Sequence, residues 1–200
     1  MAGIVADVDD PASLHRLRKR LGQHYPELNV VMANAGISRP EDLRADDWTS
    51  DDAEAIVQTN VFGVLRIAEV VLPFLKANTD PVFIATSSAL AFVPRADFPA
   101  YCASKAFLHS WLQSLRHQLR AVPVEVIELS PPYVQTGLTG AHQATDSRAM
   151  PLSTFVAEAM EKLERGETPD GELVLDRDLP RRWAERDGSF QTVFKMLNPA

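Results

Sequence analysis

Short apolar segments alternate with segments of helical periodicity along the chain, and this alternation restricts the fold more than any other feature of the sequence. The clearest apolar segment, residues 81–86 (PVFIAT), has too few polar positions to alternate, which is typical of a strand buried on both faces. Alternating strands and helices build a parallel sheet with helices packed on both faces. We therefore expect an α/β, doubly wound fold of three layers. The expected strands are 3–8, 28–33, 81–86, 124–129 and 172–175, and the expected helices are 11–22, 51–76, 98–120 and 153–165.

Size, charge and cysteine content restrict the class of protein. With 200 residues, 46% of them hydrophobic, residues 1–200 are expected to form one domain with a single core. The formal net charge of -7 predicts no nucleic-acid partner, because phosphate binding normally shows as an excess of basic residues. Cys102 is the only cysteine, so no disulfide can form within the chain, and no apolar run approaches the roughly 20 residues of a membrane span. These features predict a cytoplasmic protein without a membrane span.

A tyrosine and a lysine lie four residues apart at the start of the helix expected over 98–120. At this spacing Tyr101 and Lys105 share one face of the helix, about one turn apart. The ammonium favours the phenolate by its charge, so we expect it to lower the tyrosine pKa from about 10 toward the working pH. Such a tyrosine can donate a proton to a carbonyl oxygen as a hydride arrives, or accept one in the reverse direction.

Further polar positions lie where the expected elements would bring them toward this pair. Asn34-Ala35-Gly36 ends the second expected strand, and Ser88 follows the third, thirteen residues before the tyrosine. Asn60 lies inside the long helix among apolar neighbours, where a buried amide needs a hydrogen-bond partner. Taken alone, the N-A-G segment is more simply explained as a strand-ending turn and Ser87-Ser88 as a helix cap. Their occurrence together and in this order favours a functional site.

In this order, N-A-G, a helical Asn, S-S and Y-C-A-S-K, the motifs resemble those of the short-chain dehydrogenase/reductase family. Its members reduce carbonyls or oxidise alcohols with a nicotinamide cofactor. The resemblance implies a Rossmann-like fold, a small-molecule carbonyl or alcohol as substrate, and NAD or NADP as cofactor. It also implies that Tyr101 is the catalytic acid/base and that Lys105 lowers its pKa and holds the nicotinamide ribose. By the same resemblance Ser88 hydrogen-bonds the substrate oxygen, and Asn60 positions a proton-relay water.

The cofactor contacts follow from the same resemblance. The segment S-P-P-Y-V-Q-T is similar to the family's P-G-x-V-x-T turn, which grips the carboxamide, although Pro132 stands where glycine is usual. Asp7 corresponds to the residue that accepts from the adenine amino group, and the N-A-G segment lines the adenosine ribose side, with Ala33 replacing the first Asn of the commoner form. The cofactor-binding residues implied in this way are Asp7, Asn34, Ala35, Gly36, Tyr101, Lys105, Pro131, Val134 and Thr136.

Longer segments, such as S-S-A-L-A-F-V-P and Y-C-A-S-K-A-F-L-H-S, look like a bacterial oxidoreductase subgroup often encoded beside teichoic-acid D-alanylation genes. By the family pattern the chain is N-terminally truncated: it lacks the first two strands and the glycine-rich T-G-x-x-x-G-x-G turn, whose backbone N–H groups bind the pyrophosphate. The residues that select NAD or NADP are missing with them. Because an unpaired strand leaves backbone donors and acceptors exposed, we expect residues 3–8 to pair directly beside residues 28–33.

Two functional classes stay open. The first is an oxidoreductase that interconverts a carbonyl and an alcohol, and the second is a truncated, cofactor-incompetent remnant that acts as a binding or assembly module. A serine hydrolase using Ser88 has no G-x-S-x-G elbow in its favour. The five histidines show no metal-ligand spacing with Cys102, so we expect no metal site, and we assign no role to His109 or His117 on the polar part of their helix.

The expected helices also suggest assembly. Helix 101–120 carries a second apolar stripe, with Phe107 and Trp111, and such a stripe suggests core on one side and a partner subunit on the other. We expect a homodimer or homotetramer formed through helices 51–76 and 101–120. The C-terminal tail, residues 177–200, is mixed in character, and either a packed terminal helix or an assembly contact is consistent with it.

Overall fold

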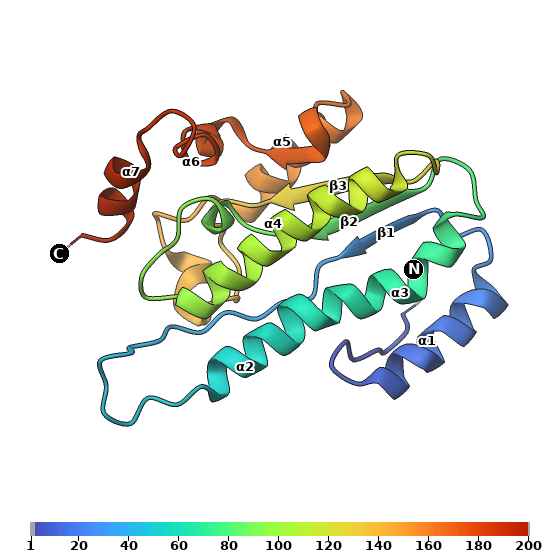
Figure 1. The fold of residues 1–200 in the computed structure, drawn as a ribbon, viewed down its shortest axis with the longest axis horizontal. Helices are drawn as coiled ribbons and strands as arrows, with labels where there is room; N and C mark the ends of the chain where they lie inside the picture. The colour runs from blue at the N-terminus through green and yellow to red at the C-terminus, as the bar shows by residue number, and fades with distance from the viewer. Residues whose placement is uncertain (1–2, 200) are drawn as a thin grey trace.

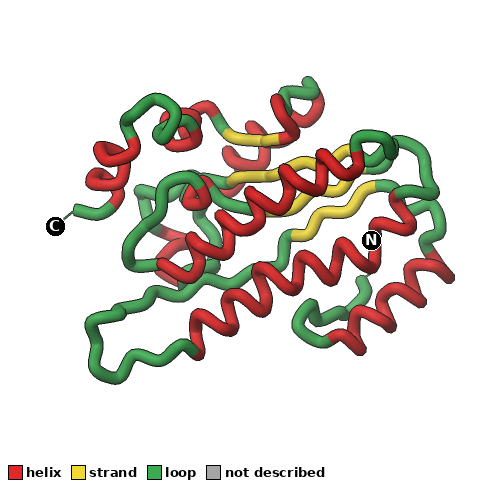
Figure 2. The backbone as a smooth tube through the Cα atoms, viewed as in Figure 1, coloured by secondary structure: helices red, strands yellow, loops and turns green. Residues whose placement is uncertain are grey.

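The computed structural model describes residues 3–199, and its centre is a sheet of four parallel strands in the order β1-β2-β3-β4 (Figures 1 and 2). Each strand pairs in parallel with the next one along the chain. Parallel neighbours need a long crossover connection, usually a helix, and this accounts for the alternation in the sequence. The predicted α/β fold is confirmed. The strands are β1 (Val30–Ala33), β2 (Val82–Thr86), β3 (Glu125–Ser130) and β4 (Glu172–Val174).

The helices lie close to their predicted positions. A short π-helical turn, Gln58–Phe62, joins α2 to α3, so residues 51–75 form one continuous helix as expected. The main helices are α1 (Pro11–His24), α2 (Asp51–Val57), α3 (Gly63–Leu75), α4 (Pro99–Leu119), α5 (Leu152–Glu164), α6 (Leu179–Arg182) and α7 (Phe190–Leu197). Short 3₁₀ turns cover Ala89–Ala91, Ala141–Thr145, Pro169–Gly171 and Asp176–Asp178.

An apolar core lies on each face of the sheet, where the strands pack against the helices that cover them. On one face α3 and α4 pack against the sheet, α1 packs against α3, and Phe83 and Leu108 in this core are fully buried (Figure 1). On the other face α5 contributes Phe155 and Ala159 against Ile84 of β2 and its neighbours. Burying one such large side chain contributes about 1.5–3 kcal/mol. The three-layer arrangement therefore follows from strands that are apolar on both faces.

The continuous helix from Asp51 to Leu75 is long and apolar enough to cross a bilayer, judged by length and composition alone. Half of its most apolar stretch is buried inside the protein. Val64, Ala68 and Val71 supply part of the first core. These contacts are those of a core helix that packs on a sheet.

The prediction for residues 3–8 is wrong: they form no strand and no ladder with β1. The turn before α1 satisfies their polar groups locally, since the Asp7 amide donates to the Ser13 hydroxyl at 2.9 Å. Val8 packs against Gly63, and its carbonyl accepts from Arg66 at 3.2 Å. These contacts hold the end of the segment on α3, while Val5 is fully exposed.

The C-terminal segment folds back on the same molecule. Asn198, which follows α7, accepts from the Ala96 amide at 2.6 Å and donates to the Pro94 carbonyl at 3.1 Å. These bonds favour a packed terminal helix over a free tail. Of the second stripe on α4, Trp111 packs against the first core and Phe107 stays 43% exposed.

Candidate active site

A cavity of about 550 Å³ opens at the carboxyl ends of β1, β2 and β3. Ligands of open α/β sheets bind at this edge, because the strands deliver side chains and backbone groups there. Polar groups line one side and an apolar wall from α5, including Phe155 and Met160, lines the other. Of the predicted residues, Asn34, Gly36, Ser88, Tyr101, Lys105, Pro131, Val134 and Thr136 line the cavity.

Lys105 is buried at the centre of this site. Its ammonium donates to the Thr86 carbonyl at 2.8 Å and lies 5.6 Å from the centre of the Tyr101 ring. The side chain is 4% exposed, and burial lowers the pKa of Lys105 to about 8, because a charged ammonium loses its hydration there. Lys105 is therefore a desolvated cation near neutral pH.

The pKa of Tyr101 is raised, whereas a lowered pKa was predicted. Burial raises the pKa of Tyr101 to about 12, and a hydrogen bond with Ser88 opposes this effect only in part. The net shift is upward because desolvation of the phenolate dominates, while the Lys105 ammonium hydrogen-bonds to the Thr86 carbonyl. Near neutral pH the phenol keeps its proton, and it can act as a proton donor.

Asn60 has the hydrogen-bond partners that a buried amide needs. It lies in the π-helical turn and is fully buried. Its oxygen accepts from the Ile37 amide at 2.8 Å, and its nitrogen donates to the Ile37 carbonyl at 2.9 Å and to the Ser104 hydroxyl at 3.0 Å. Single π-turns inside α-helices are frequent at functional sites. Asn60 thus ties the loop after β1 to the helix that carries the tyrosine.

The loop after β3 forms the floor of the cavity. Val134 is buried, and its carbonyl accepts from the Gln143 side chain at 2.7 Å. The Thr136 hydroxyl accepts from the Leu138 amide at 3.3 Å. Pro132, which replaces the usual glycine, lines the same cavity. Gln143 was not predicted as a site residue, although it is buried and fixes this loop.

Two of the predicted cofactor residues lie outside the cavity. The Asp7 carboxylate accepts from the Asp9 amide at 2.9 Å in the turn before α1. Ala35 lines a separate apolar groove beside β1, together with Leu17, Leu21 and Val31. The structure therefore brings Ser88, Tyr101 and Lys105 to one cavity with Asn34 and Gly36, and it places Asp7 and Ala35 outside that cavity.

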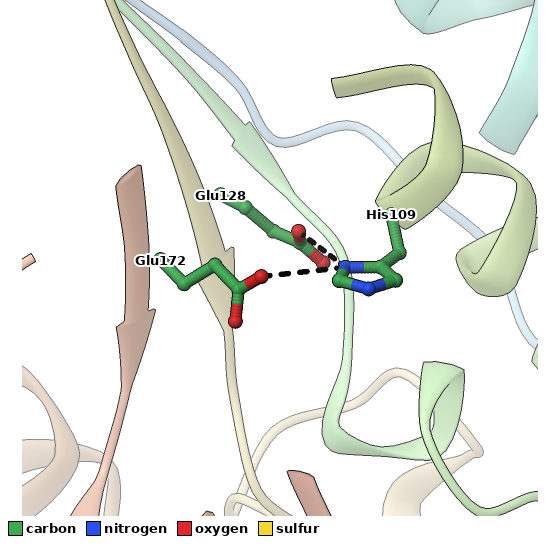
Figure 3. A group of neighbouring side chains, drawn as sticks. All are labelled: His109, Glu128 and Glu172. Carbon is green, nitrogen blue, oxygen red and sulfur yellow. Dashed lines mark hydrogen bonds and ion pairs between the residues drawn. The ribbon is translucent and has the colours of Figure 1, made fainter. Parts of the chain in front are cut away.

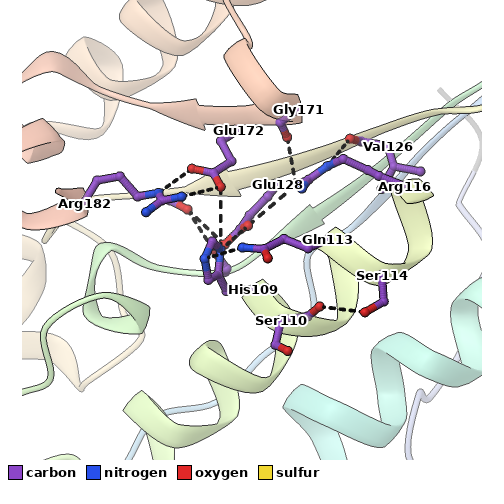
Figure 4. A network of polar contacts seen from close by, with 12 residues as sticks. His109, Ser110, Gln113, Ser114, Arg116, Val126, Glu128, Gly171, Glu172 and Arg182 are labelled. Atoms are coloured by element: carbon purple, nitrogen blue, oxygen red, sulfur yellow. Dashed lines mark hydrogen bonds and ion pairs between the residues drawn. The ribbon is translucent and has the colours of Figure 1, made fainter. Parts of the chain in front are cut away.

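The structure also shows a polar network that the sequence analysis did not predict (Figures 3 and 4). His109 is not a solvated residue, since its side chain is 18% exposed and its Nδ1 lies 2.8 Å from Glu128. Glu128 is fully buried in β3 and also accepts from Ser87. One signal was present in the sequence: a glutamate at an inward position of the apolar segment VEVIEL needs a buried partner.

Comparisons with known proteins agree with this arrangement. A family model described as short chain dehydrogenase matches residues 1–147. "Uncharacterized oxidoreductase DltE" of Bacillus subtilis is 32% identical over 197 residues, which cover 96% of this chain and 76% of the relative. An "Uncharacterized oxidoreductase" of Myxococcus xanthus is also 32% identical, over 155 residues that cover 78% of this chain and 58% of the relative.

Solved structures show the same fold. A short-chain dehydrogenase from Burkholderia cenocepacia in complex with NADP superimposes with a TM-score of 0.79 at 22% identity, covering 98% of this chain and 80% of that one. A short-chain dehydrogenase from Sphingobium yanoikuyae in complex with NADPH gives a TM-score of 0.75 at 22% identity, covering 95% and 73%. A family model matches residues 1–147, and a relative is 32% identical over 96% of this chain. The chain therefore belongs to the short-chain dehydrogenase/reductase family of oxidoreductases and is similar to its DltE-like members.

Proposed function

We propose that the chain interconverts a small carbonyl compound and the corresponding alcohol with NAD or NADP, and that Tyr101 is its acid/base. The convergence of Ser88, Tyr101 and Lys105 on one cavity carries this proposal. Ser88 and Tyr101 both line this cavity, so a carbonyl oxygen placed between them would meet two hydroxyl donors. The apolar wall from α5 suits the carbon skeleton of a small substrate.

The residues around the cavity fit the nicotinamide half of the cofactor. Gly36 leaves room at the cavity edge, because a Cβ there would lie 3.2 Å from the Asn60 oxygen and 3.5 Å from the Lys105 ammonium. Lys105 would hold the nicotinamide ribose, and the loop around the buried Val134 and the Thr136 hydroxyl would face a carboxamide. Residues 1–200 contain no glycine-rich turn for the pyrophosphate.

The cofactor, when bound, supplies or accepts the hydride. In the reductive direction the Tyr101 hydroxyl gives its proton to the substrate oxygen, so that hydride and proton together convert the carbonyl to an alcohol. Ser88 donates a hydrogen bond to the same oxygen as negative charge develops on it. The Lys105 ammonium favours the phenolate that remains, and the buried site strengthens that interaction. In the oxidative direction each proton moves the opposite way.

One observation favours a second candidate, the cofactor-incompetent binding module. Within residues 3–199 the β1 strand has a paired neighbour on one side only, and its Val30 and Met32 side chains are 51% and 48% exposed. Such an edge is a template for pairing with another polypeptide. A protein that binds through this edge would need neither the cavity nor the tyrosine.

Titration of the purified protein with NADH and NADPH, followed by nicotinamide fluorescence, tests the proposal. We expect saturable binding of at least one of them, and turnover of simple aldehydes or ketones that Tyr101→Phe abolishes. A Gly36→Val variant should weaken binding, because its side chain would fill the cavity edge. Absence of binding to either nucleotide would refute the enzyme function of this chain and favour the binding module.

Location and assembly belong to the same proposal. We place the enzyme in the cytoplasm, where reduced nicotinamide cofactors are available and where the single thiol, Cys102, stays reduced. We propose a homodimer or homotetramer through the helices 51–76 and 101–120, on which Phe62 and Phe107 are 46% and 43% exposed. Light scattering after gel filtration measures the assembly, and a strictly monomeric protein would contradict it.

A further inference from the structure

A network of buried polar residues beside the cavity is used by none of the proposed catalytic steps (Figure 4). Its centre is a pair of carboxylates: Glu128 of β3 pairs in register with Glu172 of β4, so both side chains leave the sheet on the same face. Like charges at directly opposed positions of neighbouring strands repel each other. Glu128 is completely buried, and Glu172 is 6% exposed. Such a pair is stable only where cations and hydrogen-bond donors surround it.

Two arginines balance the charge of the carboxylates. Arg182 donates two hydrogen bonds to Glu172, at 2.5 and 2.9 Å. Arg116 lies 3.7 Å from Glu128 and is held by bonds to the Val126 and Gly171 carbonyls. With a neutral His109 the network therefore has no net charge.

His109, Glu128 and Glu172 also have the donor types of a metal site, and their ligand atoms lie within 4.8 Å of one another (Figure 3). A divalent cation would have to displace Arg182 from Glu172 and would leave the network with a net positive charge in a buried place. Charge balance thus favours a hydrogen-bonded network without a metal.

The donors and acceptors of the network can be assigned. Burial raises the pKa of Glu128, but the hydrogen bond from His109, with smaller effects of Ser87 and Arg116, outweighs burial and holds that pKa below its usual value. An ionised carboxylate only accepts, so Nδ1 of His109 donates to Glu128 at 2.8 Å. Nε2 then accepts from Gln113 at 2.8 Å, and the Ser87 hydroxyl donates to the second Glu128 oxygen at 2.6 Å.

This network reaches the site through the backbone of Ser87, Ser88 and Ala89. The amides of Ser87 and Ala89 donate to β3 and the loop after it, at 2.8 and 3.1 Å. The Ser87 side chain bonds to Glu128, whereas the Ser88 hydroxyl accepts from the Leu90 amide at 3.1 Å. Because successive side chains of extended backbone alternate, Ser88 points the opposite way, toward Tyr101. His109 follows Tyr101 by two helical turns on the same face of α4.

We propose that His109 and Glu128 form a positioning pair, which fixes the end of β2 against α4 and thereby holds the Ser88 hydroxyl at the Tyr101 hydroxyl. The effect on turnover rests on the proposed function, whereas the effect on the backbone around Ser88 does not.

Hydrogen exchange measured by mass spectrometry on the whole chain tests the positioning directly. His109→Asn keeps an N–H donor close to the place of Nδ1, while His109→Gln carries its amide near the place of Nε2. We expect faster exchange of residues 86–91 in His109→Gln and in Glu128→Gln, and nearly unchanged exchange in His109→Asn. Glu125→Gln, at an exposed position of the same strand, is the matched control. Equal protection of residues 86–91 in all variants, or a uniform loss across the sheet, would overturn the proposal.

Two further measurements separate this proposal from its alternatives. In the active enzyme His109→Gln should lower kcat on the order of tenfold to a hundredfold and leave the cofactor Kd unchanged. A small displacement of a reacting group slows a reaction by about this factor. If the unaltered chain shows no turnover, the proposed function fails and the exchange result still decides the positioning role. Zn²⁺ or Mn²⁺ should leave the melting temperature unchanged, and a rise that Glu128→Gln removes would make the network a metal site instead.

Discussion

Replacement of Lys105 by methionine should stabilise the protein near neutral pH while removing its activity. The folded-state pKa of about 8, compared with 10.5 for an unperturbed lysine, corresponds to about 3 kcal/mol against the charged form, at about 1.4 kcal/mol per tenfold change in equilibrium constant. Lys105→Met removes this penalty, but it also removes the bond to the Thr86 carbonyl, which contributes about 1 kcal/mol. We expect a net gain of about 1–2 kcal/mol at pH 7.

The pH dependence identifies the origin of this gain. Because the folded-state pKa lies below the unfolded one, the unfolded chain binds more protons between about pH 8 and 10.5, and the stability of the unaltered protein rises with pH there. The contribution of Lys105 to this rise is about 2 kcal/mol between about pH 7.5 and 9.5. Titration of Cys102 affects both proteins and cancels in their difference, and Tyr101, with a pKa of about 12, titrates above this pH range.

Urea denaturation of both proteins across this pH range measures the effect. We expect the two stability curves to converge as pH rises, with the variant more stable at the low end. Lys19→Met, which changes an exposed lysine of α1, should instead run parallel to the unaltered protein. Parallel curves for Lys105→Met as well would show that Lys105 is hydrated in solution, and would refute the burial on which this reasoning depends.

Three other changes have defined outcomes. Tyr101→Phe should keep the circular dichroism spectrum and lower turnover by at least about a hundredfold, since only the proton-donating hydroxyl is lost, and retained activity would contradict the acid/base role. Gly171→Ala should destabilise the fold by about 1–3 kcal/mol in urea, because its φ is +73° and the new Cβ would lie 2.4 Å from the Arg116 Nε and 2.7 Å from the Val126 carbonyl. Gly166→Ala, at φ +66° with nothing within 4 Å of the new Cβ, should lose less stability than Gly171→Ala. An equal loss would show that the contacts of the new Cβ with Arg116 and Val126 play no part. The folded-state pKa of Glu128 lies below its ordinary 4.5, so its charge stabilises the fold above that pH, and this stabilisation is lost as pH falls through the folded pKa. The free energy of unfolding of Glu128→Gln, measured by denaturation at low pH, should therefore fall less steeply with decreasing pH.

Most of the fold could be predicted because its strands and helices have a local signal. The segment 81–86 is apolar on both faces, and β2 occupies Val82–Thr86 as predicted. Residues 3–8 have the same apolar character, but a strand also needs a neighbour in the right register. Local composition does not contain that information, and the contacts of Val8 with α3 decide the outcome.

The candidate site could likewise be predicted from the sequence only in part. Tyr101 and Lys105 were predicted to meet because their spacing on one helix fixes their directions. Their pKa values could not be predicted from spacing, because they depend on how many atoms of β2 and the loop after β3 exclude water from the two side chains. The pairing of Glu128 with Glu172 depends on the register of β3 and β4, and it was not predicted.

The energetics of Lys105 favour an enzyme over a binding module. Burial of the Lys105 ammonium lowers stability by about 3 kcal/mol, which is large compared with the 5–15 kcal/mol free energy of unfolding of a typical domain. An apolar side chain of similar length would fill the same space without that penalty, so packing gives no reason for a lysine here. In the proposed reaction, a cation beside Tyr101 would stabilise the negative charge that develops on the phenol oxygen as the tyrosine donates its proton. Lys105 is therefore unfavourable for the resting fold, and the proposed proton transfer supplies a reason for its position.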